Sequence, residues 1–150
     1  MSTAATAPGA TKPSLTIKRR FNAAPEKVYA AWTDPEKMSR WLGPANVIRC
    51  EAETDLRVGG RYRVKMVVPG DEHDVSGVYR EIIPNEKVVF TWAWKSTPER
   101  ESLVTVTIKP DGAGCLMTLH HEQFFDETAR DNHNKGWTEI VGRLAELVEG

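Results

Sequence analysis

The last part of the chain carries an apolar stripe at helical spacing, and this stripe constrains the fold more than any other feature. Its residues recur at i, i+3, i+4 and i+7: Trp137, Ile140, Val141, Leu144, Leu147 and Val148. Glu139, Arg143 and Glu146 lie off the stripe, so the pattern predicts one long amphipathic helix over residues 126–149. Such a helix has to bury its stripe against another apolar surface.

The segments before this helix alternate apolar and polar side chains with a period of two, which is typical of strands with one buried face. The run from Arg61 to Val68 is the clearest example. Short turn sequences such as Gly59-Gly60, Pro84-Asn85 and Asp111-Gly112 separate the strands, and such connections favour antiparallel neighbours. The predicted strands are residues 15–21, 46–55, 61–68, 74–83, 88–94, 101–109 and 115–122.

Two short helices are predicted between the first strand and the second. Pro25 suits the first turn of one helix, where its missing N–H costs little. Asp34 and Pro35 start the second as cap and first residue, and Gly43-Pro44 ends it. The fold class is therefore α+β: a curved antiparallel sheet of about six to seven strands around the long C-terminal helix.

Composition limits the class of protein. The 150 residues suit one domain, expected over residues 15–150, preceded by a disordered tail over residues 1–14. With 20 basic and 21 acidic side chains, the chain shows no basic surplus for nucleic acid, and no apolar stretch is long enough for membrane insertion. The tail lacks the features of a secretory signal, and only two cysteines occur, Cys50 and Cys115, so a cytoplasmic protein is expected.

Five segments together resemble a known family. They are FNAAPEKVYAAWTDPEKMSRWLGP (21–44), DLRVGGRYRVKM (55–66), SGVYREIIPNEKVVFTWAW (76–94), LVTVTIKPDGAGCLMTLHHEQF (103–124) and HNKGWTEIVGRL (133–144). In this order they resemble the bacterial branch of the activator of heat-shock protein 90 ATPase family, within the START-like (SRPBCC) superfamily.

The resemblance implies the helix-grip fold, with a cavity between the sheet and the C-terminal helix. Relatives in the superfamily bind lipids, hormones or polyketides, and some catalyse cyclisation or hydrolysis. The family name also suggests a chaperone co-regulator. In eukaryotic members that role resembles a two-domain arrangement, so a chaperone partner is ranked lowest for this chain.

Aromatic side chains are the main candidates for a ligand site in that cavity. Phe90, Trp92 and Trp94 share one face of a predicted strand, and an indole combines large apolar area with an N–H donor. The alternative for each of them is plain core packing. The predicted ligand-binding residues are Trp41, Tyr62, Met66, Tyr79, Glu81, Trp92, Trp94, Met117, His121, Phe124, His133 and Trp137.

Two of the four histidines are expected near the mouth of the cavity. His120 and His121 are adjacent in a strand, so they face opposite sides and cannot both ligate one metal; His121 is predicted to look inward. His133 lies one turn before Trp137 and could come close to His121. Such a pair could bind a ligand carboxylate or a metal, or each ring could simply be satisfied by a hydrogen bond. No metal and no cofactor is predicted.

Glu81 is the candidate acid or base. The period of two places Glu81 on the inner face with Gly77 and Tyr79, where desolvation would raise its pKa unless Arg57 or Arg61 pairs with it. The alternative is a structural ion pair. No known catalytic motif accompanies it.

Three functions follow from these observations. The first is a binding module for a small hydrophobic or amphipathic molecule. The second is an enzyme that uses the same cavity, with Glu81 and His121 as weak candidates for acid and base. The third is the chaperone co-regulator. Whether the chain forms a homodimer is left open, because the sequence shows no heptad seam or obvious patch that would identify an interface.

Overall fold

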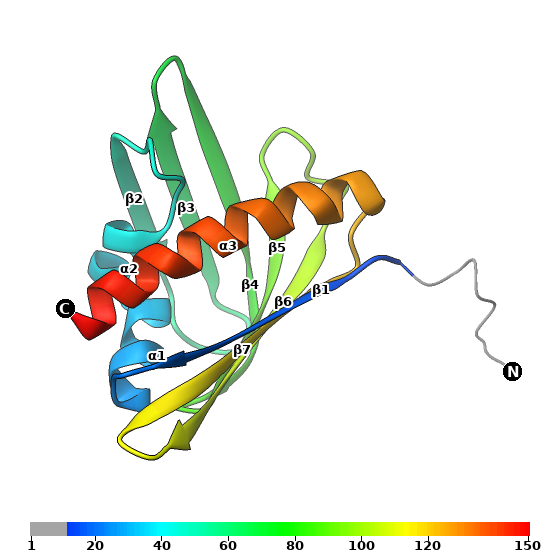
Figure 1. Cartoon of the computed structure of the whole chain (residues 1–150). Helices are drawn as coiled ribbons and strands as arrows, with labels where there is room; N and C mark the ends of the chain where they lie inside the picture. The colour runs from blue at the N-terminus through cyan, green and yellow to red at the C-terminus, as the bar shows by residue number, and fades with distance from the viewer. Residues whose placement is uncertain (1–11) are drawn as a thin grey trace, which may run out of the picture.

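Seven strands form one curved antiparallel sheet, and its concave side holds the C-terminal helix (Figure 1). The computed structural model describes residues 12–150. The elements in chain order are β1 (Leu15–Phe21), α1 (Pro25–Thr33), α2 (Pro35–Trp41), β2 (Arg49–Thr54), β3 (Arg61–Val68), β4 (Asp71–Ile83), β5 (Lys87–Trp94), β6 (Ser102–Asp111), β7 (Gly114–Glu122) and α3 (Glu127–Glu149). The predicted fold class is confirmed, and the strand count is seven within the described residues.

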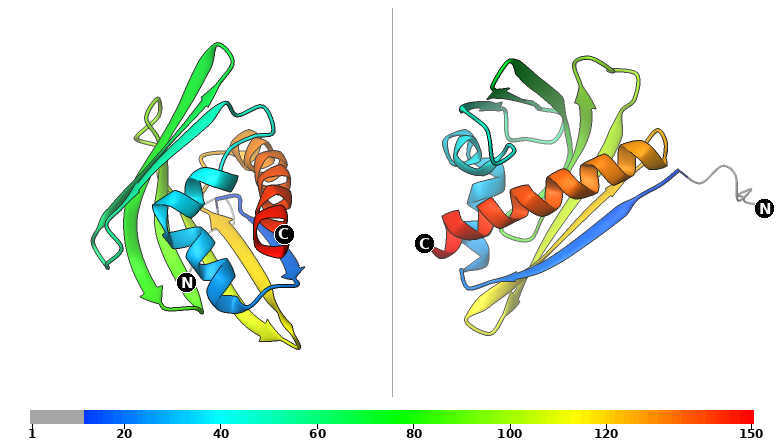
Figure 2. Two further views of the ribbon diagram at one scale, coloured as in Figure 1. Left: turned by 90° about the vertical axis from the view of Figure 1, so that its left-hand side faces the viewer. Right: turned by 45° about the horizontal axis from the view of Figure 1, so that its top comes forward.

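The strand order explains why two helices follow the first strand. The sheet has the order β1-β7-β6-β5-β4-β3-β2, so β1 and β2 form opposite edges although they are consecutive strands in the chain. The helices α1 and α2 carry the chain from one edge to the other (Figure 2). The consecutive strands from β2 to β7 are joined by antiparallel hairpins, as the short turn sequences predict.

The helix starts follow the capping signals in the sequence. Asp34 caps α2 by accepting hydrogen bonds from the backbone N–H groups of Glu36 and Lys37, and Pro35 is the first residue. Asp126 caps α3 in the same way through the N–H of Ala129 at 2.8 Å. The predicted start of α1 and the predicted bounds of α2 and α3 are confirmed to within about two residues.

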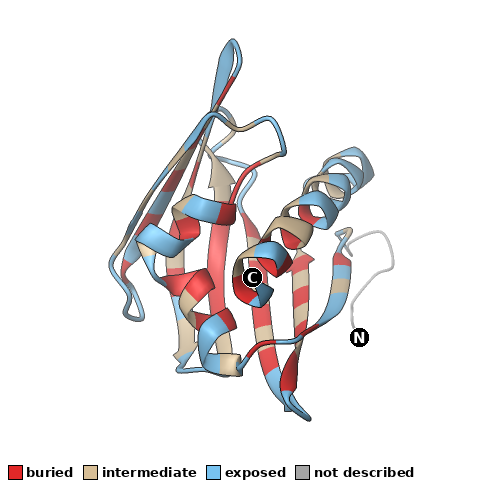
Figure 3. Ribbon diagram, turned by 60° about the vertical axis from the view of Figure 1, so that its left-hand side comes forward, coloured by how far each residue is buried: buried red, intermediate tan, exposed pale blue. Residues whose placement is uncertain are grey.

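The apolar stripe of α3 is buried only over the second half of the helix. Within α3 the buried residues are Trp137, Val141, Leu144, Ala145 and Val148. None of residues 127–136 is buried, and this first half carries exposed and half-buried side chains (Figure 3). The helix is thus packed firmly at its C-terminal end and covers the sheet more loosely at its N-terminal end.

A β-bulge in β4 overturns one prediction from the period of two. Tyr79 pairs with Phe90 and Glu81 pairs with Val89, so Arg80 is an extra residue on the bulged strand. The extra residue reverses the alternation beyond it. Glu81 therefore does not face the interior as predicted, and Ile82 packs against the core instead.

The predicted tail over residues 1–14 falls mostly outside the described part of the chain. Within the described residues, the carbonyl oxygen of Pro13 accepts a hydrogen bond of 3.2 Å from the N–H of Phe124. No helix among residues 12–150 is both long and apolar enough to cross a membrane.

Candidate functional site

The space between the sheet and α3 is almost filled by side chains. Further inside, between the sheet and the two short helices α1 and α2, a hollow of about 10 Å³ remains, close to the size that a single water needs. Trp32 on α1 takes up much of the space, because its ring lies 4.7 Å from that of Trp41 and 5.8 Å from that of Trp137. The residues around the hollow are Trp32, Met38, Leu42, Tyr62, Val64, Tyr79, Phe90 and Trp92. Within residues 12–150, this internal hollow is too small for a ligand, so the enclosed cavity that the sequence analysis expected is not shown.

A larger space lies between the sheet and the loosely packed first half of α3. This groove has a volume of about 460 Å³. It adjoins a second hollow of about 240 Å³, and the two share Trp92, Trp94, Asn132 and His133. The groove is lined by Pro44, Met66, His73, Trp92, Trp94, Asn132, His133, Gly136, Trp137 and Ile140.

His133 lies at the boundary between the groove and the second hollow, and its ring is fixed by three hydrogen bonds. Its Nδ1 lies 2.7 Å from the carbonyl oxygen of Ala129. A carbonyl can only accept, so Nδ1 carries the proton. Its Nε2 then accepts hydrogen bonds from the indole N–H groups of Trp94 at 3.0 Å and Trp92 at 3.3 Å. Burial lowers the pKa of His133, so the neutral form is favoured.

His121 is completely buried and holds the opposite tautomer. Its Nδ1 accepts a hydrogen bond of 3.0 Å from the indole N–H of Trp137, so the proton is on Nε2. Nε2 donates to the hydroxyl of Ser102 at 2.7 Å, and that hydroxyl donates to the carbonyl oxygen of Trp92. Burial, followed by the influence of His133 and His120, lowers the pKa of His121 to about 2.

The predicted approach of the two imidazoles is confirmed, since the rings of His121 and His133 lie 5.2 Å apart. Phe124 packs on both rings, at 4.1 Å from His121 and 4.9 Å from His133. Both nitrogens of His121 are already hydrogen-bonded, however, and His121 does not line the groove. Among residues 12–150, no three His, Cys, Asp or Glu side chains are grouped to hold a metal ion.

Glu81 and His121 do not form an acid–base pair. The side chain of Glu81 is 45% exposed and forms an ion pair of 3.1 Å with Lys87 across the β4–β5 hairpin. His121 is enclosed by the core. The structural ion pair, which the sequence analysis kept as the alternative for Glu81, is what the structure contains, with Lys87 as the partner in place of Arg57 or Arg61.

The other predicted ligand-binding residues fall into four locations. Met66, Trp92, Trp94, His133 and Trp137 line the groove, and Phe124 lines the adjoining hollow. Tyr62 and Tyr79 surround the small internal hollow. Trp41 and Met117 are core residues: the indole of Trp41 donates to the carbonyl of Ala31, and the sulfur of Met117 accepts from the indole of Trp32.

Several groove residues were missed by the sequence analysis. Asn132, Gly136 and Ile140 follow one another at intervals of four, which places them on one face of α3. This spacing is the signal that could have revealed them beside His133 and Trp137. Pro44 and His73 come from a loop and a strand end, and only the tertiary fold brings them to the helix.

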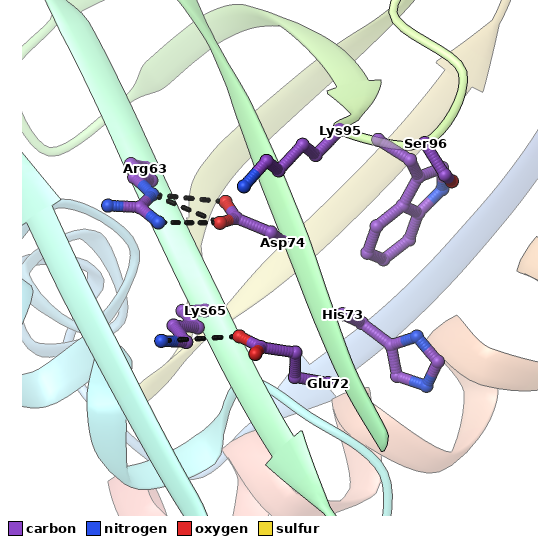
Figure 4. A pocket seen from close by; sticks show the side chains of 8 residues that line it. Arg63, Lys65, Glu72, His73, Asp74, Lys95 and Ser96 are labelled. Atoms are coloured by element: carbon purple, nitrogen blue, oxygen red, sulfur yellow. Dashed lines mark hydrogen bonds and ion pairs between the residues drawn. The ribbon is translucent and has the colours of Figure 1, made fainter.

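A charged cleft of about 680 Å³ borders the groove at the projecting ends of β3 and β4. Arg63 contacts both carboxylate oxygens of Asp74, and Lys65 pairs with Glu72 at 3.2 Å (Figure 4). The guanidinium of Arg63 lowers the pKa of Asp74. Because each of these acidic groups neutralises a cation, the cleft is a region of ion pairs rather than a strong field of one sign.

The sequence matches the family described as Activator of Hsp90 ATPase homolog 1-like protein over residues 22–149. The chain belongs to this family. No curated protein matches the chain significantly.

Solved structures agree with the family assignment. Protein CV1439 from Chromobacterium violaceum is 28% identical, with a TM-score of 0.81 over 91% of this chain and 98% of that one. The AHSA1 protein SPO3351 from Silicibacter pomeroyi is 29% identical, with a TM-score of 0.77 over 89% and 96% of the two chains. Protein NE0264 from Nitrosomonas europaea, at 21% identity and a TM-score of 0.77 over 90% and 93%, shows the fold alone.

Proposed function

We propose that this family member binds a small aromatic or amphipathic molecule in the groove between α3 and the sheet. The observation that carries the proposal is the chemistry of the groove wall. Three indole rings, from Trp92, Trp94 and Trp137, lie beside Met66 and Ile140 in a space of about 460 Å³. Small-molecule sites are commonly of this size, with mostly apolar and aromatic walls and a few polar groups that orient the ligand.

Because the interior is filled, the proposed ligand is held in the groove. Trp92 is 5% exposed and borders both the internal hollow and the groove, so it forms the floor of the groove. A ligand therefore lies on this floor under the first half of α3, and does not enter the centre of the fold. Because none of residues 127–136 is buried, this half of the helix has room to adjust to ligands of different thickness.

A neutral fluorescent probe, N-phenyl-1-naphthylamine, tests the proposal because its emission rises when it leaves water. We expect saturable binding to the purified protein. In Gly136→Phe the new ring should occupy the groove, since a Cβ at this position meets no atom within 4 Å. We expect at least a tenfold loss of probe affinity, with thermal unfolding showing that the variant is folded.

Asn134→Phe is the matched control, because Asn134 is exposed on the same helix and does not line the groove. This variant should bind the probe as the parent protein does. Equal affinity in Gly136→Phe and the parent protein, or no binding by the parent protein, would contradict the proposal.

A further inference from the structure

The Nε2 atom of His133 is the acceptor for two indole N–H groups at once. Trp92 and Trp94 stand on neighbouring inward-facing positions of β5, and both donate to this nitrogen, at 3.3 and 3.0 Å. A neutral imidazole nitrogen has one lone pair, so two donors share one acceptor. The donors are therefore in excess at this point, which is here called the indole–imidazole node (His133, Trp92, Trp94).

In the neutral state the node has one acceptor, Nε2 of His133, and two indole donors. Protonation of Nε2 would turn that acceptor into a third donor. The Nδ1–H of His133 is already committed to the carbonyl of Ala129, so an added proton can only go to Nε2. The N–H of Nε2 and the two indole N–H groups would then converge on one place with no acceptor between them. An oxygen atom with negative charge satisfies all three, and charge-assisted hydrogen bonds of this kind are the strong ones.

We propose that the indole–imidazole node binds the carboxylate of the ligand, and that binding is coupled to the uptake of one proton by Nε2 of His133. The proton comes from solvent, and the carboxylate oxygens replace Nε2 as acceptors for the indole groups. This inference rests on the proposed function, because the apolar part of the same molecule lies in the groove. The ligand is then an aromatic or amphipathic carboxylic acid.

The position of the node supports this ligand chemistry. All three node residues, together with Asn132, line both the groove and the adjoining hollow. A carboxylate at the node can therefore be attached to an apolar body that lies on Trp137 and Met66 in the groove. A neutral ligand gains less binding free energy there. Its acceptor atom only replaces Nε2 of His133, which already accepts hydrogen bonds from both indole N–H groups.

Charged and titratable groups face the node from several elements. From β7, His121 faces it but stays neutral, because both of its nitrogens are hydrogen-bonded in the core. From β4, His73 lines the groove and contacts the ring of Trp94. From the β5–β6 connection, Arg100 lines the adjoining hollow, and its positive charge favours an anion there.

Further charged groups belong to the start of α3. Asp126 also lines the adjoining hollow, and its carboxylate accepts the N–H of Ala129 as the helix cap. Arg130 is paired with Asp131 at 2.8 Å. Asp126 faces the hollow, and its negative charge opposes the effect of Arg100 on a bound anion.

Two probes of equal shape test the inference: 2-naphthoate, which carries a carboxylate, and 2-naphthamide, which is neutral. Isothermal titration calorimetry in two buffers of different ionisation enthalpy counts the protons taken up. For 2-naphthoate we expect uptake of about one proton and an affinity that rises about tenfold per pH unit as the pH falls from 8 to 6. For 2-naphthamide we expect no proton uptake and no change in affinity with pH.

His133→Gln keeps an acceptor for the indole groups but cannot gain a proton. In this variant 2-naphthoate should bind without proton uptake and without pH dependence. His120→Gln is the matched control, because His120 lies on the opposite face of β7 and contacts Thr16. Proton uptake should be the same in this control as in the parent protein.

The outcomes separate the two proposals. Binding of 2-naphthamide together with pH-independent binding of 2-naphthoate would overturn the coupling and leave the proposed function in place. Proton uptake that persists in His133→Gln and disappears in His73→Gln would also overturn the proposed coupling to His133. If neither naphthalene probe nor the neutral fluorescent probe binds, both proposals are wrong.

Discussion

The indole nitrogen of Trp137 on α3 donates a hydrogen bond of 3.0 Å to Nδ1 of His121 on β7. This bond joins the helix to the sheet at the point where the buried stripe of α3 begins. One turn earlier, His133 makes a second polar connection through Trp92 and Trp94. The first half of the helix is therefore held to the sheet by indole–imidazole hydrogen bonds, while the second half is held by apolar packing.

Removing the donor of Trp137 should destabilise the protein. Trp137→Phe keeps an aromatic ring but leaves Nδ1 of the buried His121 without a partner, which costs about 1–3 kcal/mol of unfolding free energy. Urea denaturation measures the change. In a double-mutant cycle with His121→Phe, the double variant should lose less than the sum of the single losses. Simple additivity would show that the bond does not contribute.

Acid should destabilise the fold through His121. Its pKa is about 2 in the folded protein against an ordinary value of 6.5, so below pH 6.5 the unfolded chain binds a proton that the folded chain excludes. The contribution is complete above pH 6.5 and falls by about 1.4 kcal/mol per pH unit as the pH drops toward the folded value. Urea denaturation from pH 7.5 to 4.5 tests this.

His121→Gln should show a shallower pH dependence of the unfolding free energy than the parent protein over that range. His120→Gln, on the opposite face of the strand, should keep the steep dependence. Identical slopes for the parent protein and His121→Gln would contradict the assignment.

Gly77 should not tolerate any side chain. A Cβ at this position would collide with the carbonyl oxygen of Thr91, which also accepts a hydrogen bond of 2.6 Å from the hydroxyl of Tyr62. Gly77→Ala should therefore cost more than about 3 kcal/mol, or prevent folding. Gly142→Ala is the control: a Cβ there meets nothing within 4 Å inside α3, and it should stabilise by about 1 kcal/mol. Thermal unfolding of the two variants should move in opposite directions.

The Arg63–Asp74 ion pair should contribute modestly to stability. Arg63 is half exposed, although the side chain of Asp74 is only 10% exposed, so Asp74→Asn should lose about 0.5–1 kcal/mol. The loss should shrink in 1 M salt, where charges are screened. Asp55→Asn breaks the more exposed pair with Arg57 and should change the unfolding free energy very little. Equal losses in the two variants would contradict this ranking.

Glu81 shows most clearly where prediction from the sequence failed. The alternation through Gly77 and Tyr79 predicts an inward carboxylate, and the bulge at Arg80 turns it outward to Lys87. Strand periodicity describes an unbroken ladder, and a bulge depends on how the neighbouring strand pairs. That pairing cannot be read from the segment alone.

The sequence by itself determined the elements, their order and, apart from β4 beyond the bulge, their buried faces, because helical and extended backbones impose periods of 3.6 and 2 on the residues that form them. The cap at Asp34 follows from the same local chemistry. Only the tertiary structure decided that Trp32 fills the interior and that the open space lies under the first half of α3. Side chains from separate elements compete for one volume there, and their fit depends on long-range packing.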